Sequence, residues 1–566
     1  MMERALQSPA GGSRGGRALV VGLVAAAVVS AVLRFMDLER DPAVICWSAD
    51  AWLDPGYYLY NVRSFLLFDQ WRPGGGHSLF VAPGYVWLTT GWFRIWGLGY
   101  AQAVLLSVIF GFVVIGSMAL YARTLSPTTR LIPWMLSPAV AALVSLLLSY
   151  VMFARQRVPK GDMEFMAVCA MTALVFVLLP SARQERRDRR FIALAVLGGF
   201  GLGLAPFVKL IAAIFSAAVL VAWISSYVLL DRDWAVTWRR ATPFVGAGLA
   251  LSGIVWLAWL LWLAGLDALH PMLRSVLKYT GASVSFLPTS TYDESGSKAF
   301  APARFLESNL FCRHPVETLL TSVAFFRCAS SRHWNWPRLL TCVWLIAGVA
   351  ALACMHFAPL RYRLPFLLPM IVLGAQLWSG LAADTLPRLT VRRSLIVYPA
   401  SALVAGYALT YGVLDHFAPD LLAERGLPVQ VTIGGTAVCA LLLWYCFERL
   451  PRKVLAGSLA CLFLVSSAVQ WQWGESRVSH ELRDTALEIA EKYPGHTLTF
   501  GMLGSHVPIF TMQDAYPAWE EYPKGNVTLF VGDSIDLKSI PARSTVVEHM
   551  DLPNFRRTLV VARLWW

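Results

Sequence analysis

Apolar segments long enough to cross a lipid bilayer recur along this chain from Arg17 to Trp473. A transmembrane helix needs about 20 mainly apolar residues, because each residue adds only a short rise across the hydrocarbon core. Only 15% of the 566 residues are charged, against roughly 25% in soluble domains. The sequence therefore predicts an all-α polytopic membrane protein.

The first predicted span covers about Ala18–Met36, which we interpret as a retained anchor and not as a cleaved signal. Tyr85–Gly97 is rich in tryptophan and carries Arg94, so we expect it to lie along the membrane interface. With the first span, about 13 transmembrane helices are expected, the others at about 101–122, 131–153, 164–180, 191–208, 210–230, 242–266, 314–327, 339–358, 363–383, 395–413, 429–447 and 454–473.

Arginine clusters predict the orientation of these spans. The formal net charge is +13, and the basic residues gather in every second loop, which the positive-inside rule places in the cytoplasm. The amino terminus is then cytoplasmic and the carboxyl terminus is outside. Because the clusters are separated by apolar spans and do not form one basic face, nucleic-acid binding is not expected. The cytoplasmic clusters are Arg123 and Arg130; Arg183, Arg186, Arg187, Arg189 and Arg190; Arg232, Arg239 and Arg240; Arg327, Arg332 and Arg338; Arg388, Arg392 and Arg393; and Arg449, Arg452 and Lys453.

The chain divides where this pattern changes. We expect a cytoplasmic leader at 1–17, a membrane module at 18–266 with an outer loop at 37–100, a second outer loop at 267–313, another membrane module at 314–473 and a periplasmic domain at 474–566. The last segment starts with a helical pattern at Leu482–Tyr493. Alternating runs at Thr497–Phe500, Asn526–Val531 and Thr558–Arg563 then predict strands, hence a small α/β domain.

The nine cysteines show no CxxC pattern and no histidine-rich partner, so they indicate neither a metal site nor a redox motif. Most lie in apolar spans as small packing residues. Cys46 and Cys312 both fall on the predicted outer face and are a candidate disulfide pair.

Two acidic clusters stand at the outer ends of predicted spans. Asp54 lies in the first outer loop, and Asp162 and Glu164 lie in the second, each among arginines or lysines. Acids close to a bilayer are costly unless they pair or function, so together they could provide a base and a site for an anionic headgroup. An ordinary reading is equally open: Asp54 starts a helix before Pro55, and Asp162 and Glu164 cap the following span.

Three stretches of the first outer loop carry a recognisable pattern: LDPGYYLYNVRSFLLFDQW, beginning at Leu53, then Ala82-Pro83-Gly84-Tyr85, then Arg94-Ile95-Trp96-Gly97. They resemble the first loop of the GT-C glycosyltransferases, most closely the protein O-mannosyltransferase and aminoarabinose transferase branch. In this resemblance Asp54 matches the candidate catalytic base, and Asn61 and Arg63 match an Asn-Ala-Arg motif. The chain departs from the pattern at Pro55, where Glu is usual, and at Val62, where Ala is usual.

Later motifs follow in the order that the family shows. Arg157 and Asp162 have the spacing of an Arg followed five residues later by an acid. Asp162-Met163-Glu164 resembles the Asp-x-Glu of oligosaccharyltransferases, where the acids help to bind a divalent metal. Lys209 ends a glycine-rich stretch, as does a family lysine near the lipid phosphate, and Arg361-Tyr362 resembles part of an Arg-Tyr-x-Leu-Pro element.

The resemblance covers about residues 18–383. It implies that 18–266 is a GT-C-like catalytic module and that 314–473 is a variable module. The implied reaction is inverting transfer of a sugar from a polyprenyl-phosphate donor to a hydroxyl of a lipid, glycan or protein acceptor. The implied location is the inner (plasma) membrane, with the active site facing the periplasm.

The resemblance also assigns candidate site residues. The implied catalytic acids are Asp54 and Asp162. Cations for the leaving phosphate are Lys209, Arg361 and Arg63; residues for the substrate cavity are Tyr57, Tyr362, Glu164, Arg157 and His270. Asp54, Asp162 and Glu164 would also permit a divalent metal such as Mg or Mn, since hard cations prefer oxygen ligands.

Two other functions stay open. A lipid-linked glycan transporter or flippase would usually show internal repeats and acids at the bilayer midplane, and neither is evident here. An oligosaccharide ligase or polymerase would usually have a large outer loop with arginines and histidines, which 267–313 is long enough to provide.

Overall fold

The computed structural model describes residues 14–41, 49–71, 77–125, 137–184, 188–230, 232–266, 269, 314–331, 334–353, 360–417, 429–475, 479–501, 503–511, 513–518, 526–538, 540, 542–553 and 557–565. The candidate disulfide pair Cys46 and Cys312 lies outside the described residues.

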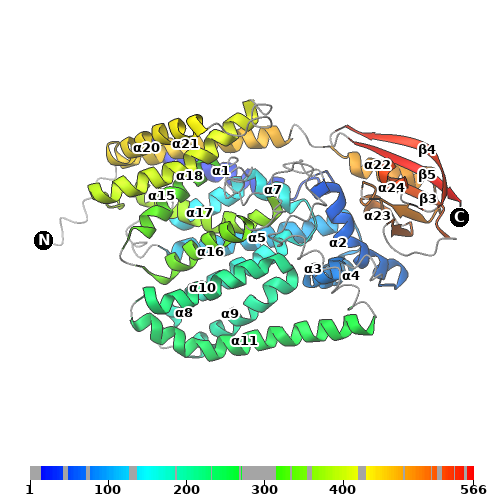
Figure 1. Cartoon of the computed structure of the whole chain (residues 1–566), viewed down its shortest axis with the longest axis horizontal. Coiled ribbons are helices and arrows are strands. Elements are labelled where there is room, and N and C mark those ends of the chain that lie inside the picture. The colour runs from blue at the N-terminus through cyan, green and yellow to red at the C-terminus, as the bar shows by residue number, and fades with distance from the viewer. Residues whose placement is uncertain are drawn as a thin grey trace.

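Helices make up most of the described chain, and a small sheet lies at one end of the long axis (Figure 1). The expected helical membrane part and the small C-terminal domain with a sheet are therefore confirmed. The longer helices are α1 (Arg14–Leu33), α2 (Ala49–Phe68), α4 (Pro83–Trp96), α5 (Tyr100–Thr124), α6 (Pro138–Leu148), α8 (Asp162–Gln184), α9 (Asp188–Val208), α10 (Ala213–Leu229), α11 (Arg232–Gly265), α15 (Pro315–Ala329), α16 (Trp336–Ala353), α17 (Leu360–Ala382), α18 (Val391–Phe417), α20 (Val429–Glu448), α21 (Arg452–Glu475) and α22 (Glu481–Lys492).

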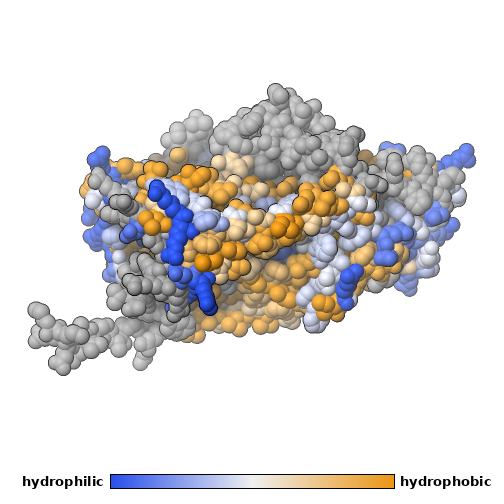
Figure 2. All heavy atoms as spheres, turned by 90° about the horizontal axis from the view of Figure 1, so that it is seen from below, coloured by the Kyte–Doolittle hydropathy of each residue, from blue (hydrophilic) through white to orange (hydrophobic). Residues whose placement is uncertain are grey.

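The helical part has the surface of a membrane protein. Among the described residues, 7 helices are long and apolar enough to span a bilayer, or 8 if one bent pair counts as a span, and three more are apolar but shorter. Seen from the side of α11, an apolar belt separates polar residues that gather toward the two ends of the molecule (Figure 2). The chain is thus a multi-pass membrane protein, while the count of 13 spans and their orientation remain predictions.

One expected span is broken. The sequence predicted a single helix over 131–153, but α6 ends at Leu148 and α7 (Tyr150–Gln156) leaves it at a bend of 60°. The bend frees backbone carbonyls, which must find other donors inside a membrane. Arg34 donates to the carbonyls of Leu146 and Leu147 at 3.2 and 2.9 Å, and the Trp471 indole donates to that of Leu148 at 3.0 Å.

Helices α9 and α11 pack almost backbone to backbone. A Cβ atom at Gly199 would lie 2.0 Å from the carbonyl oxygen of Val245, so only glycine permits this approach.

The sequence predicted a span at 242–266, whereas α11 begins at Arg232 and includes Arg239 and Arg240 in its first turns. With 34 residues it is about 51 Å long at 1.5 Å per residue, longer than the hydrocarbon core is thick.

The first outer loop is itself helical. It contains α2, α3 (His77–Val81) and α4, and α4 corresponds to the interfacial helix expected at Tyr85–Gly97. At 14 residues, or about 21 Å, α4 is too short to cross the core.

The C-terminal domain contains a five-stranded sheet in the order β2-β1-β3-β5-β4. Strands β1 (Leu498–Phe500), β2 (Ala515–Pro517) and β3 (Leu529–Gly532) are parallel, and β4 (Arg543–Leu552) and β5 (Arg557–Trp565) join in antiparallel pairing. The patterns at Leu482–Tyr493, Thr497–Phe500, Asn526–Val531 and Thr558–Arg563 correspond to α22, β1, β3 and β5, so the expected α/β domain is present. Strands β2 and β4 were not anticipated.

The domain contacts the membrane part through α23 (Val507–Phe510), which lies against α2 (Figure 1). Phe510 packs on Tyr100 at the start of α5 with ring centroids 4.7 Å apart. Tyr60 of α2 in turn joins the apolar core of the domain, with its ring 5.7 Å from that of Phe500.

Candidate active site

A buried ion pair joins the start of α8 to the end of α9. The Lys209 Nζ lies 2.5 Å from Oδ1 of Asp162, and each side chain is 1% exposed. Lys209 follows directly after α9, and Asp162 is the first residue of α8, so the two helix ends hold the charges together. Lys209 also donates to the carbonyl of Lys160 at 3.0 Å.

Two further charged residues complete this cluster. Lys160 Nζ lies 3.6 Å from the second carboxylate oxygen of Asp162. Glu164 Oε1 accepts a hydrogen bond of 2.8 Å from the hydroxyl of Ser107, which belongs to α5. Asp162 and Glu164 are in the first turn of α8, where the helix dipole favours acids, so the simple capping explanation also holds for them. Asp162 and Glu164 therefore stabilise the start of α8 and also belong to a buried charged site.

Helix α2 brings the first outer loop to this cluster. The ring of Tyr58 lies 4.8 Å from Lys209 Nζ, and its centroid is 6.2 Å from that of Tyr85 in α4. Asp54 precedes Tyr58 by one helical turn, and residues four apart share a face of a helix. The side chains of Asp54 and Tyr57 lie outside the described residues. Tyr58 of α2 therefore contacts the charged cluster through Lys209.

The structure removes one ordinary explanation for Asp54. As a helix start it would stand at the boundary of α2, but α2 begins at Ala49 and Pro55 lies inside it. Proline inside a helix removes a backbone hydrogen bond and normally costs about 3 kcal/mol. Capping therefore does not account for an acid followed by proline at this place.

Arg63 is engaged with the C-terminal domain. Its guanidinium donates to the carbonyl of Thr511 at 3.0 Å and to that of Gln513. Its neighbour in the motif, Asn61, donates to the hydroxyl of Ser78 in α3 at 3.3 Å. The resemblance suggested a phosphate ligand at Arg63, whereas these contacts make it an anchor between α2 and the domain.

Arg157 also binds backbone instead of facing an open cavity. It donates to the carbonyls of Leu33 at 3.0 Å, Met36 and Asp37 at the end of α1. The hydroxyl of Tyr100 donates to the backbone carbonyl of Arg157 at 3.1 Å. Burial lowers the pKa of Arg157 to about 10, so it stays charged at neutral pH. Its described role is to fasten α1 to the turn before α8.

The other predicted residues are placed only in part. Arg361 and Tyr362 belong to the first turn of α17, but their side chains lie outside the described residues, and His270 lies wholly outside them. The described part of the chain contains no group of three or more His, Cys, Asp or Glu able to hold a metal. Of the predicted metal ligands, Asp162 is paired with Lys209, and Glu164 is bonded to Ser107.

Sequence reasoning missed the contribution of the C-terminal domain to this region. A Cβ atom at Gly56, two residues after Asp54, would lie 2.2 Å from the carbonyl oxygen of Ser505. The adjacent His506 is buried, donates from Nδ1 to the carbonyl of Leu503 at 3.0 Å, and has its pKa lowered by burial to about 4. No local signal could reveal this contact, because some 450 residues separate the two segments.

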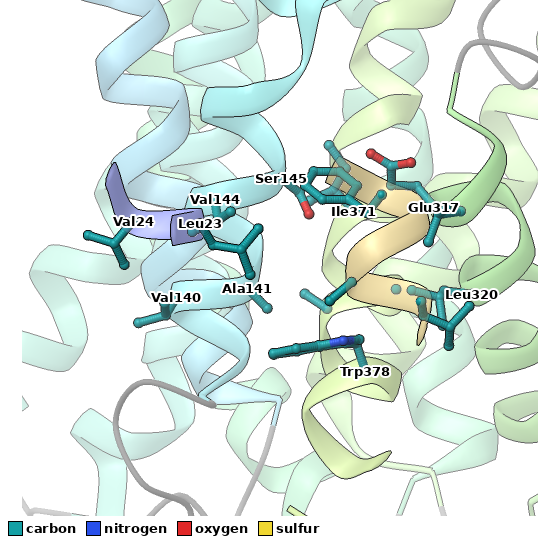
Figure 3. A pocket seen from close by; sticks show the side chains of 16 residues that line it. Leu23, Val24, Val140, Ala141, Val144, Ser145, Glu317, Leu320, Ile371 and Trp378 are labelled. Atoms are coloured by element: carbon teal, nitrogen blue, oxygen red, sulfur yellow. The ribbon is translucent and has the colours of Figure 1, made fainter. Parts of the chain in front are cut away.

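A separate apolar cavity lies between α1, α6, α15, α17 and α21 and opens onto about 660 Å³ of space. Figure 3 shows the Glu317 carboxylate and Ser145 on one side and Trp378 at the other end, among aliphatic side chains. The lining contains none of the predicted site residues. Its chemistry suits a hydrocarbon chain, and the charged cluster lies elsewhere.

No protein-family model and no curated protein matches the sequence. The fold, however, is similar to solved structures of ArnT from Cupriavidus metallidurans. ArnT bound to undecaprenyl phosphate aligns with 96% of this chain and 97% of its own, at 17% identity and a TM-score of 0.55. The apo state of ArnT aligns over 96% and 98%, at 16% identity and a TM-score of 0.50. The likeness expected from the first outer loop thus extends over nearly the whole chain as a shared fold: this protein has the fold of these ArnT structures.

Proposed function

We propose that the protein is an inverting glycosyltransferase that moves a sugar from a polyprenyl-phosphate donor to an acceptor hydroxyl outside the cytoplasm. The observation that carries the proposal is the buried Lys209–Asp162 pair beneath α2, the helix that contains Asp54. The solved relative in fold that is bound to undecaprenyl phosphate supports a donor of this chemical class.

In the proposed reaction, the Asp54 carboxylate takes the proton of the acceptor hydroxyl while that oxygen attacks the anomeric carbon. The bond between this carbon and the phosphate oxygen breaks, the configuration inverts, and polyprenyl phosphate leaves with the bonding electrons. Accurate placement must assist, because a carboxylate is a weak base at its ordinary pKa. The chain holds Asp54 on α2, which α4 and the C-terminal domain contact on two sides.

The leaving phosphate needs positive charge nearby. Lys209, whose Nζ lies 4.8 Å from the ring of Tyr58 in α2, is the first candidate, and Arg361, at the start of α17, is the second. In this proposal Asp162 positions Lys209 through their ion pair. Arg63 and Arg157 act as anchors, because their described hydrogen bonds go to backbone carbonyls.

A divalent metal fits this cluster poorly. Lys209 Nζ lies 2.5 Å from Oδ1 of Asp162 and Lys160 Nζ lies 3.6 Å from Oδ2, so these two positive charges would repel a further cation. The proposed reaction therefore uses no metal step.

The test is Asp54→Asn, which removes the base and keeps the shape of the side chain. Transfer should fall at least about 100-fold, within the usual contribution of a general base, while stabilisation by added undecaprenyl phosphate remains. Asp69→Asn is the matched control, at the exposed end of α2, where the left-handed backbone (φ +53°) also suits asparagine. Full activity of Asp54→Asn would overturn the proposal. Mass spectrometry of lipids that accumulate in a deletion strain would identify the donor.

A further inference from the structure

Two adjoining hollows lie at the end of the bundle opposite the candidate active site. Gln376, which lines one of them, donates to the carbonyl of Leu125 just after α5, whereas Tyr100 at the other end of α5 bonds Arg157. Since α5 has 25 residues, about 37 Å of helix separates the two regions. The positive-inside rule places this end in the cytoplasm.

The lining of the first hollow is strongly basic. It opens onto about 760 Å³ of space between α15, α16, α17 and α18, and its lining contains no carboxylate. The second hollow, of about 720 Å³, shares Arg388 with it and contains one acid, Asp384, which already pairs with Arg452 at 2.9 Å. The cations that line the two hollows are Arg327, Arg338, Arg388, Arg393, Arg452 and Lys453.

Some of these guanidinium groups are held in place by the surrounding structure, which the positive-inside rule alone does not require. Arg327 donates to the carbonyl of Pro387 at 2.5 Å. Arg338 is half-buried, and its Nε is buried with no hydrogen-bond partner among the described residues. Several fixed cations around one hollow repel each other unless an anion joins them.

The surroundings indicate what that anion is. Arg393 lines the first hollow from the start of α18, and the same helix exposes Val391, Leu395 and Ile396. A ligand with a charged head in the hollow could therefore lay apolar chains along α18 in the membrane. Basic pockets between helices at the cytoplasmic side are known to accept anionic lipid headgroups.

We propose that these joined hollows bind the phosphodiester headgroup of an anionic phospholipid from the cytoplasmic leaflet. Arginine suits this ligand because its planar fork forms two hydrogen bonds with phosphate oxygens. The site is independent of the proposed transfer reaction, since it lies at the other end of the helices.

The test uses the full chain in neutral detergent, titrated with phosphatidylglycerol or cardiolipin, with phosphatidylcholine and inorganic phosphate as comparisons. Ligands that bind only the folded state raise the unfolding temperature. Anionic lipid should raise the unfolding temperature by several degrees, and phosphatidylcholine should leave it unchanged. Inorganic phosphate should produce only a small part of the increase seen with anionic lipid. The double variant Arg338→Gln/Arg393→Gln should need at least 10-fold more lipid for half of the effect. Arg239→Gln, exposed on the same end but outside both hollows, should respond as the unchanged protein does.

Equal stabilisation by phosphatidylcholine, or an unchanged lipid response in the double variant, would overturn the proposal. Complete stabilisation by phosphate alone would overturn the lipid assignment in favour of a free phosphate site. If the double variant does not fold, native mass spectrometry of Arg393→Gln decides, because this half-buried residue makes no hydrogen bond that fixes a helix among those described. Loss of retained anionic lipid would support the site, and retention equal to that of the unchanged protein would contradict it.

Discussion

Lys209 Nζ lies 2.5 Å from Asp162 Oδ1, with both side chains almost fully buried, and this contact fixes the end of α9 against the start of α8. Sequence motifs suggested separate roles for the two residues, one for the donor phosphate and one for catalysis. The structure makes them one unit, so changes at either residue have to be read together.

Removal of one partner should be costly. Lys209→Met leaves the Asp162 carboxylate buried without its counter-ion, and breaking such a pair typically costs about 3–5 kcal/mol. Thermal or denaturant unfolding in detergent measures this loss. The double variant Asp162→Asn/Lys209→Met should recover much of the stability, because the carboxylate charge that Lys209→Met leaves uncompensated is also removed. If the two single losses simply added in the double variant, the residues would not be coupled.

Chelation should leave sugar transfer unchanged. Lys209 and Lys160 already face the two carboxylate oxygens of Asp162, so treatment with EDTA followed by removal of the chelator is not expected to change the transfer rate. The measurement is transfer to acceptor before and after treatment, with added Mg or Mn as a second arm. A loss that Mg or Mn restores would show that Asp54 and Glu164 form a metal site after all.

Gly199→Ala should weaken the packing of α9 on α11. The added methyl group would meet the Val245 carbonyl oxygen at 2.0 Å, so the backbones must separate, at a cost of about 1–3 kcal/mol. Gly246→Ala is the matched control, because a Cβ atom there meets nothing within 4 Å. Unfolding temperatures of both variants test the expectation, and equal temperatures would contradict it.

Two buried groups at the C-terminal domain, Asp41 and His506, should make the free energy of unfolding change with pH in opposite directions. Burial raises the pKa of Asp41 from 3.8 to about 6, although the carboxylate accepts hydrogen bonds from Ser479 and from the backbone of Leu482. The folded protein therefore binds more protons than the unfolded chain between these values, and stability falls as pH rises from about 4 to 6. Burial lowers the pKa of His506 from 6.5 to about 4, so its contribution falls as pH drops through that range.

In the unchanged protein these two slopes largely cancel between pH 4 and 6. Asp41→Asn removes the contribution of the Asp41 carboxyl, so the stability of this variant should rise between pH 4 and 6. His506→Gln removes the contribution of the imidazole, so the stability of this variant should fall as pH rises from 4 to 6. Unfolding temperatures measured at half-unit steps of pH test both, and identical profiles for the two variants would show that neither group is buried in the working protein.

Arg63→Met should loosen the C-terminal domain from α2. The variant loses the hydrogen bonds to the carbonyls of Thr511 and Gln513, and hydrogen bonds with a charged donor contribute about 1.5–3 kcal/mol each. Limited proteolysis should cut the segment between α21 and β1 several-fold faster. Arg563→Met, on an exposed position of β5, should be cut at the unchanged rate. Equal cutting of Arg63→Met and the unchanged protein would rule out the anchoring role.

Much of the helical architecture was predictable because it depends on local properties. Long apolar runs predict spans wherever they occur, and the amphipathic pattern at Leu482–Tyr493 predicts α22 without reference to the rest of the chain. The break at Ser149 escaped prediction for the same reason: the run over 131–153 is apolar throughout. Nothing nearby indicates that Arg34 and Trp471 supply the missing donors.

The sequence by itself determined a membrane protein with a GT-C-like first loop and a small α/β domain, since hydropathy, charge and short motifs are read residue by residue. Only the tertiary structure decided that Lys209 pairs with Asp162, that Arg63 binds the C-terminal domain, and that arginines flanking two separate loops surround one hollow. These relationships join segments far apart in the chain, and the energy of a charge depends on which neighbours burial brings to it.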